Sequence, residues 1–148
     1  QVVAPAKVSY ARGITTLQGQ PCDDSRGGVD YRSEIVSRDE MKHEIESVGF
    51  TGERVEQMLA VSLAEGGRQV SCVADENLVD VKWGPSIGVF SIRTLNAELG
   101  SGSCRDRNRI DGDLHQQAVC AFEISGQGRT LQPWSTFTNG RWQKYVGQ

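Results

Sequence analysis

The chain has 148 residues, of which 37% are hydrophobic and 24% are charged, a balance that fits one globular domain and excludes a disordered chain. Lysine and arginine number 16 against 19 aspartates and glutamates, so the net charge is −3, and no basic run is long enough for general nucleic-acid binding. The longest nearly uncharged stretch, residues 55–64, falls short of the roughly 20 apolar residues that a membrane-spanning helix needs. We therefore expect neither nucleic acid nor a membrane as a partner.

The first 36 residues alternate short β-branched pieces with glycine and proline, which predicts an irregular arm packed on the rest of the chain. Residues 37–40 have the spacing of a capping box, and Gly49 supplies a stop, so a helix is predicted from about 38 to 48. A second helix is predicted from near Thr51, with apolar residues at intervals of three and four, into the glycine pair at 66–67.

The second half of the chain has weaker strand signals. Residues 68–88 are polar and predict a loop, whereas residues 87–95 are β-branched and aromatic and predict a short strand or a tight β-turn. A further helix is predicted over residues 113–124, and residues 139–146 are expected to close the domain with aromatic side chains packed inward. The predicted fold class is α+β, mainly α, with a small β element.

Four cysteines are spread along the chain without any CxxC pair, and the two histidines lie apart, so no metal site and no cofactor is expected. An even number of dispersed cysteines fits two disulfides and a secreted protein, the alternative being four buried free thiols. Pairing of Cys104 with Cys120 would close a loop of about 15 residues and stabilise the fold by about 3 kcal/mol. Cys22 would then pair with Cys72, although the spacing leaves the other pairings of the four cysteines open.

Glu65 is the strongest candidate for chemistry. It ends an apolar helix and precedes two glycines that open the chain toward a cleft. Desolvation against Leu59 and Leu63 and the negative end of the helix dipole both disfavour a carboxylate, so we expect a raised pKa for Glu65. A carboxyl group that stays protonated near neutral pH suits general acid catalysis of glycoside cleavage. The alternative is a solvated charge at a helix end.

Four motifs follow one another in a characteristic order: Leu-Ala-Glu-Gly-Gly at 63–67, Trp-Gly-Pro-Ser-Ile-Gly-Val-Phe-Ser-Ile-Arg at 83–93, Arg-Asp at 105–106 and Pro-Trp-Ser-Thr-Phe-Thr-Asn-Gly at 133–140. In this order they resemble the lysozyme-like superfamily of peptidoglycan glycosidases, over roughly residues 38 to 142. The order of glutamate, glycine turn and aromatic segment is similar to goose-type lysozymes and soluble lytic transglycosylases. Closer still are lysozyme-like modules of actinobacterial and phage lysins and secreted fungal muramidases.

The resemblance implies a lysozyme-like domain over residues 37–148 in which Glu65 protonates the glycosidic oxygen between N-acetylmuramic acid and N-acetylglucosamine. It implies that Ser86 and Gly88 shape the floor of the sugar cleft, where glycine permits close backbone approach. The sequence departs from the family pattern twice, with Gly66 where serine usually follows the acid and Ser91 where glutamine usually follows the glycine turn. Ser91 is counted among the expected sugar contacts.

A second carboxylate decides the mechanism, because an inverting hydrolase needs a base roughly 6.5–9.5 Å from the acid and a retaining enzyme needs a nucleophile at about 5 Å. Asp80 is preferred, since goose-type relatives place auxiliary acids between the catalytic glutamate and the glycine turn, and Asp75 is next. Asp106 lies between Arg105 and Arg107 and is interpreted as a structural ion-pair partner that fixes a loop.

Trp134 is the aromatic residue expected to contact sugar, because it follows a proline in a loop of hydroxyl and amide side chains that includes Thr136 and Asn139. The sequence thus predicts a secreted, monomeric muramidase that cleaves the β-1,4 bond of peptidoglycan glycan strands. Three alternatives remain: a lytic transglycosylase that forms anhydro products through attack by the sugar C6 hydroxyl, a non-catalytic wall-binding module, and a structural or inhibitory secreted protein.

Overall fold

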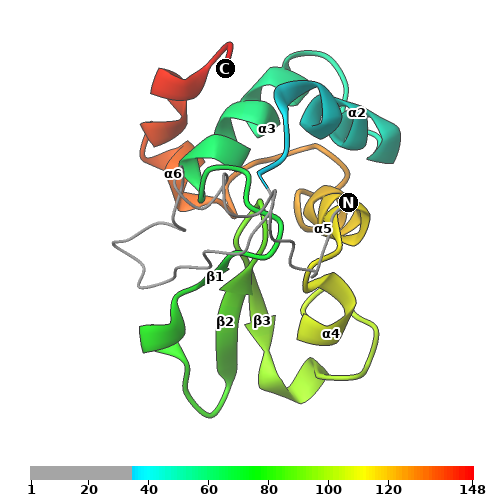
Figure 1. Cartoon of the computed structure of the whole chain (residues 1–148), viewed down its shortest axis with the longest axis vertical. Coiled ribbons are helices and arrows are strands. Elements are labelled where there is room, and N and C mark those ends of the chain that lie inside the picture. Colours follow the sequence, from blue (N-terminus) through cyan, green and yellow to red (C-terminus); the bar gives the residue numbers. More distant parts are fainter. Residues whose placement is uncertain (1–34) are drawn as a thin grey trace.

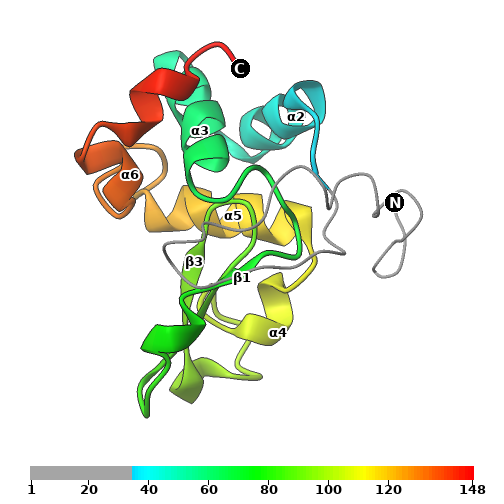
Figure 2. The same ribbon diagram turned by 60° about the vertical axis from the view of Figure 1, so that its left-hand side comes forward.

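The computed structural model describes residues 35–148, and in this part the fold is mainly helical with a small antiparallel sheet. Helices α2, α3 and α6 gather at one end of the molecule, the sheet and α4 lie at the other, and α5 runs between them (Figures 1 and 2). The predicted N-terminal arm, except for its last two residues, lies outside the described residues. The elements are α2 (Arg38–Val48), α3 (Glu53–Ala64), β1 (Val73–Ala74), the 3-10 helix η2 (Glu76–Leu78), β2 (Trp83–Ile87), β3 (Ile92–Leu95), η3 (Asn96–Glu98), α4 (Arg107–Ile110), α5 (Leu114–Ile124), α6 (Ser135–Thr138) and η4 (Arg141–Tyr145).

The capping signals set the bounds of α2, as predicted. The Ser37 hydroxyl oxygen accepts the backbone N–H of Glu40, which satisfies one of the free donors of the first turn. Gly49 ends the helix with a φ of 126°, and a side chain at this position would overlap the ring of Phe122. The glycine therefore serves both as a stop and as the contact that lets α2 approach α5 closely.

The core lies where α2, α3 and α5 meet above the sheet. Met41 and Ile45 of α2 and Met58 and Val61 of α3 are completely buried. The apolar faces of the three helices thus pack against one another in one core, as the apolar spacing in the sequence predicted.

No helix within residues 35–148 is long and apolar enough to span a bilayer.

The sheet has the order β1-β2-β3 and is antiparallel throughout. The predicted loop over residues 68–88 is wrong where β1, η2 and β2 form. The strand or tight turn predicted over residues 87–95 is a turn at 88–91 followed by β3, which begins at Ile92. The register shifts between Trp83 and Ser86, so Pro85 lies in a bulge where its missing N–H interrupts no regular ladder. Pairing with β1 and β3 therefore stabilises β2, although its glycine and proline have a low propensity for strands.

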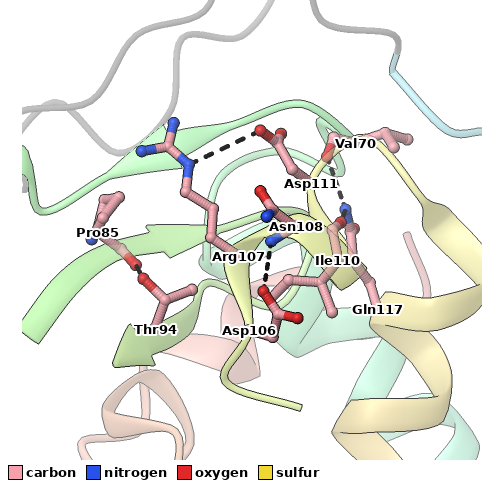
Figure 3. A network of polar contacts seen from close by, with 9 residues as sticks. All are labelled: Val70, Pro85, Thr94, Asp106, Arg107, Asn108, Ile110, Asp111 and Gln117. Atoms are coloured by element: carbon pink, nitrogen blue, oxygen red, sulfur yellow. Dashed lines mark hydrogen bonds and ion pairs between the residues drawn. The ribbon is translucent and has the colours of Figure 1, made fainter. Parts of the chain in front are cut away.

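A buried glutamine on α5 anchors the turn between β2 and β3. The Gln117 side chain accepts the N–H of Val89 at 3.0 Å and donates to the carbonyl oxygens of Val70 at 2.9 Å and Ile110 at 2.8 Å. Figure 3 shows this contact with Val70 beside α4. Gly88 faces the same side chain, so the turn is fastened to the helical core.

The predicted Cys104–Cys120 disulfide is present and joins the segment before α4 to α5, with a Cα–Cα distance of 5.2 Å. Cys72 is also disulfide-bonded, which excludes the alternative of four free thiols. Cys22 lies outside the described residues, so its pairing with Cys72 stays a prediction. At the C-terminal end, Trp142 is partly buried, and its ring stacks on that of Phe137 with 5.1 Å between the ring centroids. This agrees with the expected inward packing of an aromatic side chain from residues 139–146.

Candidate functional site

Glu65 lies at the C-terminal end of α3 and its side chain is only 2% exposed, so it is not a solvated surface charge. The Thr136 hydroxyl donates a hydrogen bond of 2.7 Å to its Oε2. The Ser91 hydroxyl donates to the Glu65 backbone carbonyl oxygen at 2.9 Å. Side chains from α6 and from the turn between β2 and β3 therefore hold both ends of this residue.

A cleft of about 270 Å³ opens beside Glu65 between the end of α3, the sheet and the segment that leads into α6. The cleft carries charged groups of both signs together with aromatic and hydroxyl side chains. It is lined by Glu65, Asp75, Trp83, Ser86, Ser91, Ile92, Arg93, Arg105, Ile124, Pro133, Trp134 and Ser135. Of the expected carboxylates, the structure thus brings Glu65 and Asp75 to one cleft.

Asp75 follows β1 in a left-handed conformation, with a φ of 61°, and is 5% exposed. The Ser86 hydroxyl donates a hydrogen bond of 2.5 Å to Asp75 Oδ2. Ser86 is paired in register with Ala74, the residue before Asp75, so the sheet itself brings the two side chains together. The expected floor residue Ser86 therefore lies in the cleft and orients a carboxyl group there.

Asp80 lies elsewhere and does not line the cleft. It is exposed, and its Oδ1 accepts the backbone N–H groups of Lys82 and Trp83 at 2.8 and 2.7 Å. These two hydrogen bonds lower the pKa of Asp80 from its ordinary value. The residue closes the turn that leads into β2.

Asp106 has a structural role, but through amide groups rather than through the expected ion pairs. Its carboxylate accepts the backbone N–H groups of Gly100, Gly102 and Asn108 at 2.8 to 3.0 Å, which lowers its pKa. Arg107 instead reaches Asp111 at 3.8 Å, as Figure 3 shows. Asp106 thus caps α4 and fixes the preceding loop.

The other expected sugar contacts are distributed differently. Trp134 lines the cleft but is only 4% exposed, and its indole N–H donates to the Phe90 carbonyl oxygen at 2.8 Å. Thr136 is buried and is engaged with Glu65 rather than facing the cleft. Asn139 is exposed outside the cleft and accepts the N–H of Arg141. Gly88 packs against Gln117 and is not part of the cleft wall.

Seven residues that line the cleft were absent from the expected set, and three of them carry a charged or an aromatic side chain: Trp83, Arg93 and Arg105. Trp83 is half-buried, and the guanidinium carbon of Arg93 lies 5.2 Å from its ring centroid. Arg93 is half-buried between buried Ile92 and Thr94 on β3, and Ile92 lines the cleft as well. Trp83, Arg93 and Arg105 all stand in the motifs at 83–93 and 105–106, but no local signal singled them out as cleft residues.

Among residues 35–148, no group of three or more His, Cys, Asp and Glu side chains is placed to hold a metal ion. A family model described as a lysozyme-like domain matches residues 42–136, which is more than half of the chain. No curated protein and no solved structure shows significant similarity to the chain. The matched region includes α3 with Glu65, the whole sheet and Thr136, so it covers the site described above. The chain belongs to the lysozyme-like domain family, whose members act on peptidoglycan as glycosidases or transglycosylases.

Proposed function

We propose that this protein is a muramidase that hydrolyses the β-1,4 bond between N-acetylmuramic acid and N-acetylglucosamine, with Glu65 as general acid. The observation that carries the proposal is the buried carboxyl group of Glu65 at the mouth of a cleft, held by Thr136, with a second carboxyl group in the same cleft. This is the pair of groups that glycoside cleavage requires.

The acid step follows from the surroundings of Glu65. Burial and the C-terminal end of α3 both favour the neutral carboxyl group, which has a proton to donate. The Thr136 hydroxyl fixes Oε2 and thereby the plane of the carboxyl group. Transfer of the proton to the glycosidic oxygen lets the leaving sugar depart as an alcohol while positive charge develops on the ring of the other sugar.

Asp75 is our candidate for the second carboxylate, in place of Asp80. Asp75 lines the cleft, whereas the exposed Asp80 is committed to two backbone amides in a turn outside it. The hydrogen bond from Ser86 fixes the orientation of the Asp75 carboxyl group in the cleft. In this role Asp75 activates the attacking water or stabilises the positive charge on the sugar.

The test is mass spectrometry of the soluble products released from purified peptidoglycan by the wild type and by Glu65→Gln, Asp75→Asn and Asp80→Asn. We expect reducing N-acetylmuramic acid ends from the wild type and from Asp80→Asn, the matched control. We expect a loss of several orders of magnitude in Glu65→Gln and a large loss in Asp75→Asn.

The other outcomes separate the rival functions. Anhydro ends would identify a lytic transglycosylase and remove the need for a base that activates water. Release of no fragments by a wild type that still binds the wall would identify a binding module. Loss of activity in Asp80→Asn but not in Asp75→Asn would reverse our choice of the second carboxylate.

We also propose that the protein works outside the cell. The Cys104–Cys120 disulfide and the bonded Cys72 support this location, because disulfides persist in oxidising compartments. Peptidoglycan, the material on which the family acts, lies in the same compartment.

A further inference from the structure

Two guanidinium groups line the cleft, and neither forms an ion pair within 4 Å of a carboxylate among residues 35–148, although Arg93 is near enough to Asp80 to contribute to the lowered pKa of that carboxyl group. Arg93 donates from Nε to the Gly84 carbonyl oxygen and from Nη2 to that of Leu78, both at 2.7 Å. Arg105 donates from Nη1 to the Arg93 carbonyl oxygen at 2.6 Å. All three acceptors are neutral, so the two positive charges in this part of the cleft are solvated or balanced only from a distance.

The burial of this charge is unfavourable by itself. Arg105 is half-buried, and desolvation lowers the pKa of its guanidinium group. Partly buried cations are normally matched by an anion, because removal of water from an unmatched charge costs free energy. Arg38 is an example of such a match, because it reaches both carboxylate oxygens of Glu56.

The two side chains are also held in place. Arg93 lies opposite Ser86 in the sheet register, stacks near Trp83 and is tied to two carbonyl oxygens, so its guanidinium group cannot swing freely. Arg105 is linked to the same strand through the Arg93 carbonyl oxygen. Donors fixed in this way lose little conformational entropy when they bind an anion.

We propose that Arg93 and Arg105 form a subsite that binds a carboxylate carried by the glycan strand, so that the cleft selects acidic over neutral glycan. This inference rests on the proposed function for its ligand. A guanidinium group matches a carboxylate in shape and charge better than it matches a sugar hydroxyl. The carboxylate has two possible sources in peptidoglycan, the lactyl group of muramic acid and the peptide attached to it.

The experiment measures binding by calorimetry in the full-length Glu65→Gln protein, so that no substrate is consumed. Four soluble glycan strands serve as probes. Two carry carboxylates: strands with peptides, and strands whose peptides have been removed to free the lactyl carboxylate. The other two are the same strands after conversion of their carboxylates to amides. Each is titrated into Glu65→Gln alone and into Glu65→Gln combined with Arg105→Gln or with Arg107→Gln. Arg107 carries the same charge but pairs with Asp111 outside the cleft, which makes it the matched control.

We expect carboxylate strands to bind about tenfold more tightly than their amides, a preference typical of charge-assisted hydrogen bonds. Arg105→Gln should abolish most of that preference, whereas Arg107→Gln should retain it. The ligand is identified by the kind of strand that loses more affinity when its carboxylates become amides: the lactyl carboxylate if this is the peptide-free strand, the peptide carboxylate if it is the strand with peptides. Equal affinity for acid and amide, an unchanged preference in Arg105→Gln, or no binding at all would overturn the subsite.

The proposed function can fail separately. A wild type that releases no fragments, in a protein whose preference for carboxylates depends on Arg105, would remove the catalytic assignment and leave the subsite standing. If the wild type releases fragments but shows no preference for carboxylates, the catalytic assignment stands and the subsite is removed.

Discussion

Substitution of Gly88 by alanine tests how the turn between β2 and β3 is fastened to the core. Gly88 has a φ of +82°, and a Cβ atom built on it would overlap Cδ and Oε1 of Gln117. Gln117 is completely buried and its amide makes three hydrogen bonds, so it cannot move aside without breaking them. We therefore expect Gly88→Ala to destabilise the protein far more than backbone strain alone would.

The magnitude follows from two contributions. An alanine in the left-handed region costs about 1 to 2 kcal/mol. Displacement of Gln117 leaves the Val89 N–H and the Val70 carbonyl oxygen without a partner, at about 1 kcal/mol each at the low end, whereas the Ile110 carbonyl oxygen still accepts the Asp113 N–H at 3.2 Å. The sum of about 3 to 4 kcal/mol is a large part of the roughly 5 to 15 kcal/mol that stabilises a typical domain.

Urea unfolding of the purified variants measures this difference. Gly102→Ala is the matched control, because Gly102 has a φ of +83° and its Cβ would meet nothing within 4 Å. The unfolding free energy of Gly102→Ala should fall only by the cost of placing an alanine in the left-handed region. In a Gln117→Ala background the overlap is gone, so Gly88→Ala should then cost little more than Gly102→Ala does.

Equal losses of stability in Gly88→Ala and Gly102→Ala would refute the reasoning, since only the overlap with Gln117 distinguishes the two sites. Strict additivity of Gly88→Ala and Gln117→Ala would refute it too. The double variant keeps the test usable if Gly88→Ala alone fails to fold.

Thr136→Val removes the hydroxyl that fixes Glu65 Oε2; it should lower kcat about tenfold to a hundredfold with little change in KM, and Thr136→Ser should restore the rate. Loss of this donor also disfavours the charged carboxylate, so the limb of the pH–rate profile that reports Glu65 should move to higher pH, and an unmoved limb would contradict the role of Thr136. Asp106→Asn should be less stable than the wild type at neutral pH, because three backbone N–H groups lower the pKa of Asp106 in the folded state. That stabilisation is present above the unfolded pKa and is lost as pH falls through the lowered folded value, so the difference in unfolding free energy should shrink in acid; a constant difference would rule out the charge as its cause.

Local signals in the sequence predicted the three long helices α2, α3 and α5, whereas the short helices α4 and α6 were not predicted. The capping box at Ser37, the stop at Gly49 and the apolar spacing of α3 and α5 depend on residues within a few positions of one another. The sheet was predicted poorly, because β2 contains glycine and proline and exists only through its pairing with β1 and β3. Trp83 and Arg93 stand at the two ends of the motif at 83–93, but their place in the cleft depends on this pairing and was not predicted.

The sequence by itself determined the helical frame, the family resemblance and the choice of Glu65, because each is encoded by nearby residues in a fixed order. The side chains that contact Glu65 or share its cleft are decided only by the tertiary structure. Thr136, which is 71 positions away in the chain, reaches its carboxyl group, and Asp75 rather than Asp80 shares its cleft. Such contacts depend on the packing of α3, α6 and the sheet, and no spacing along the chain reports the distance between side chains that folding brings together.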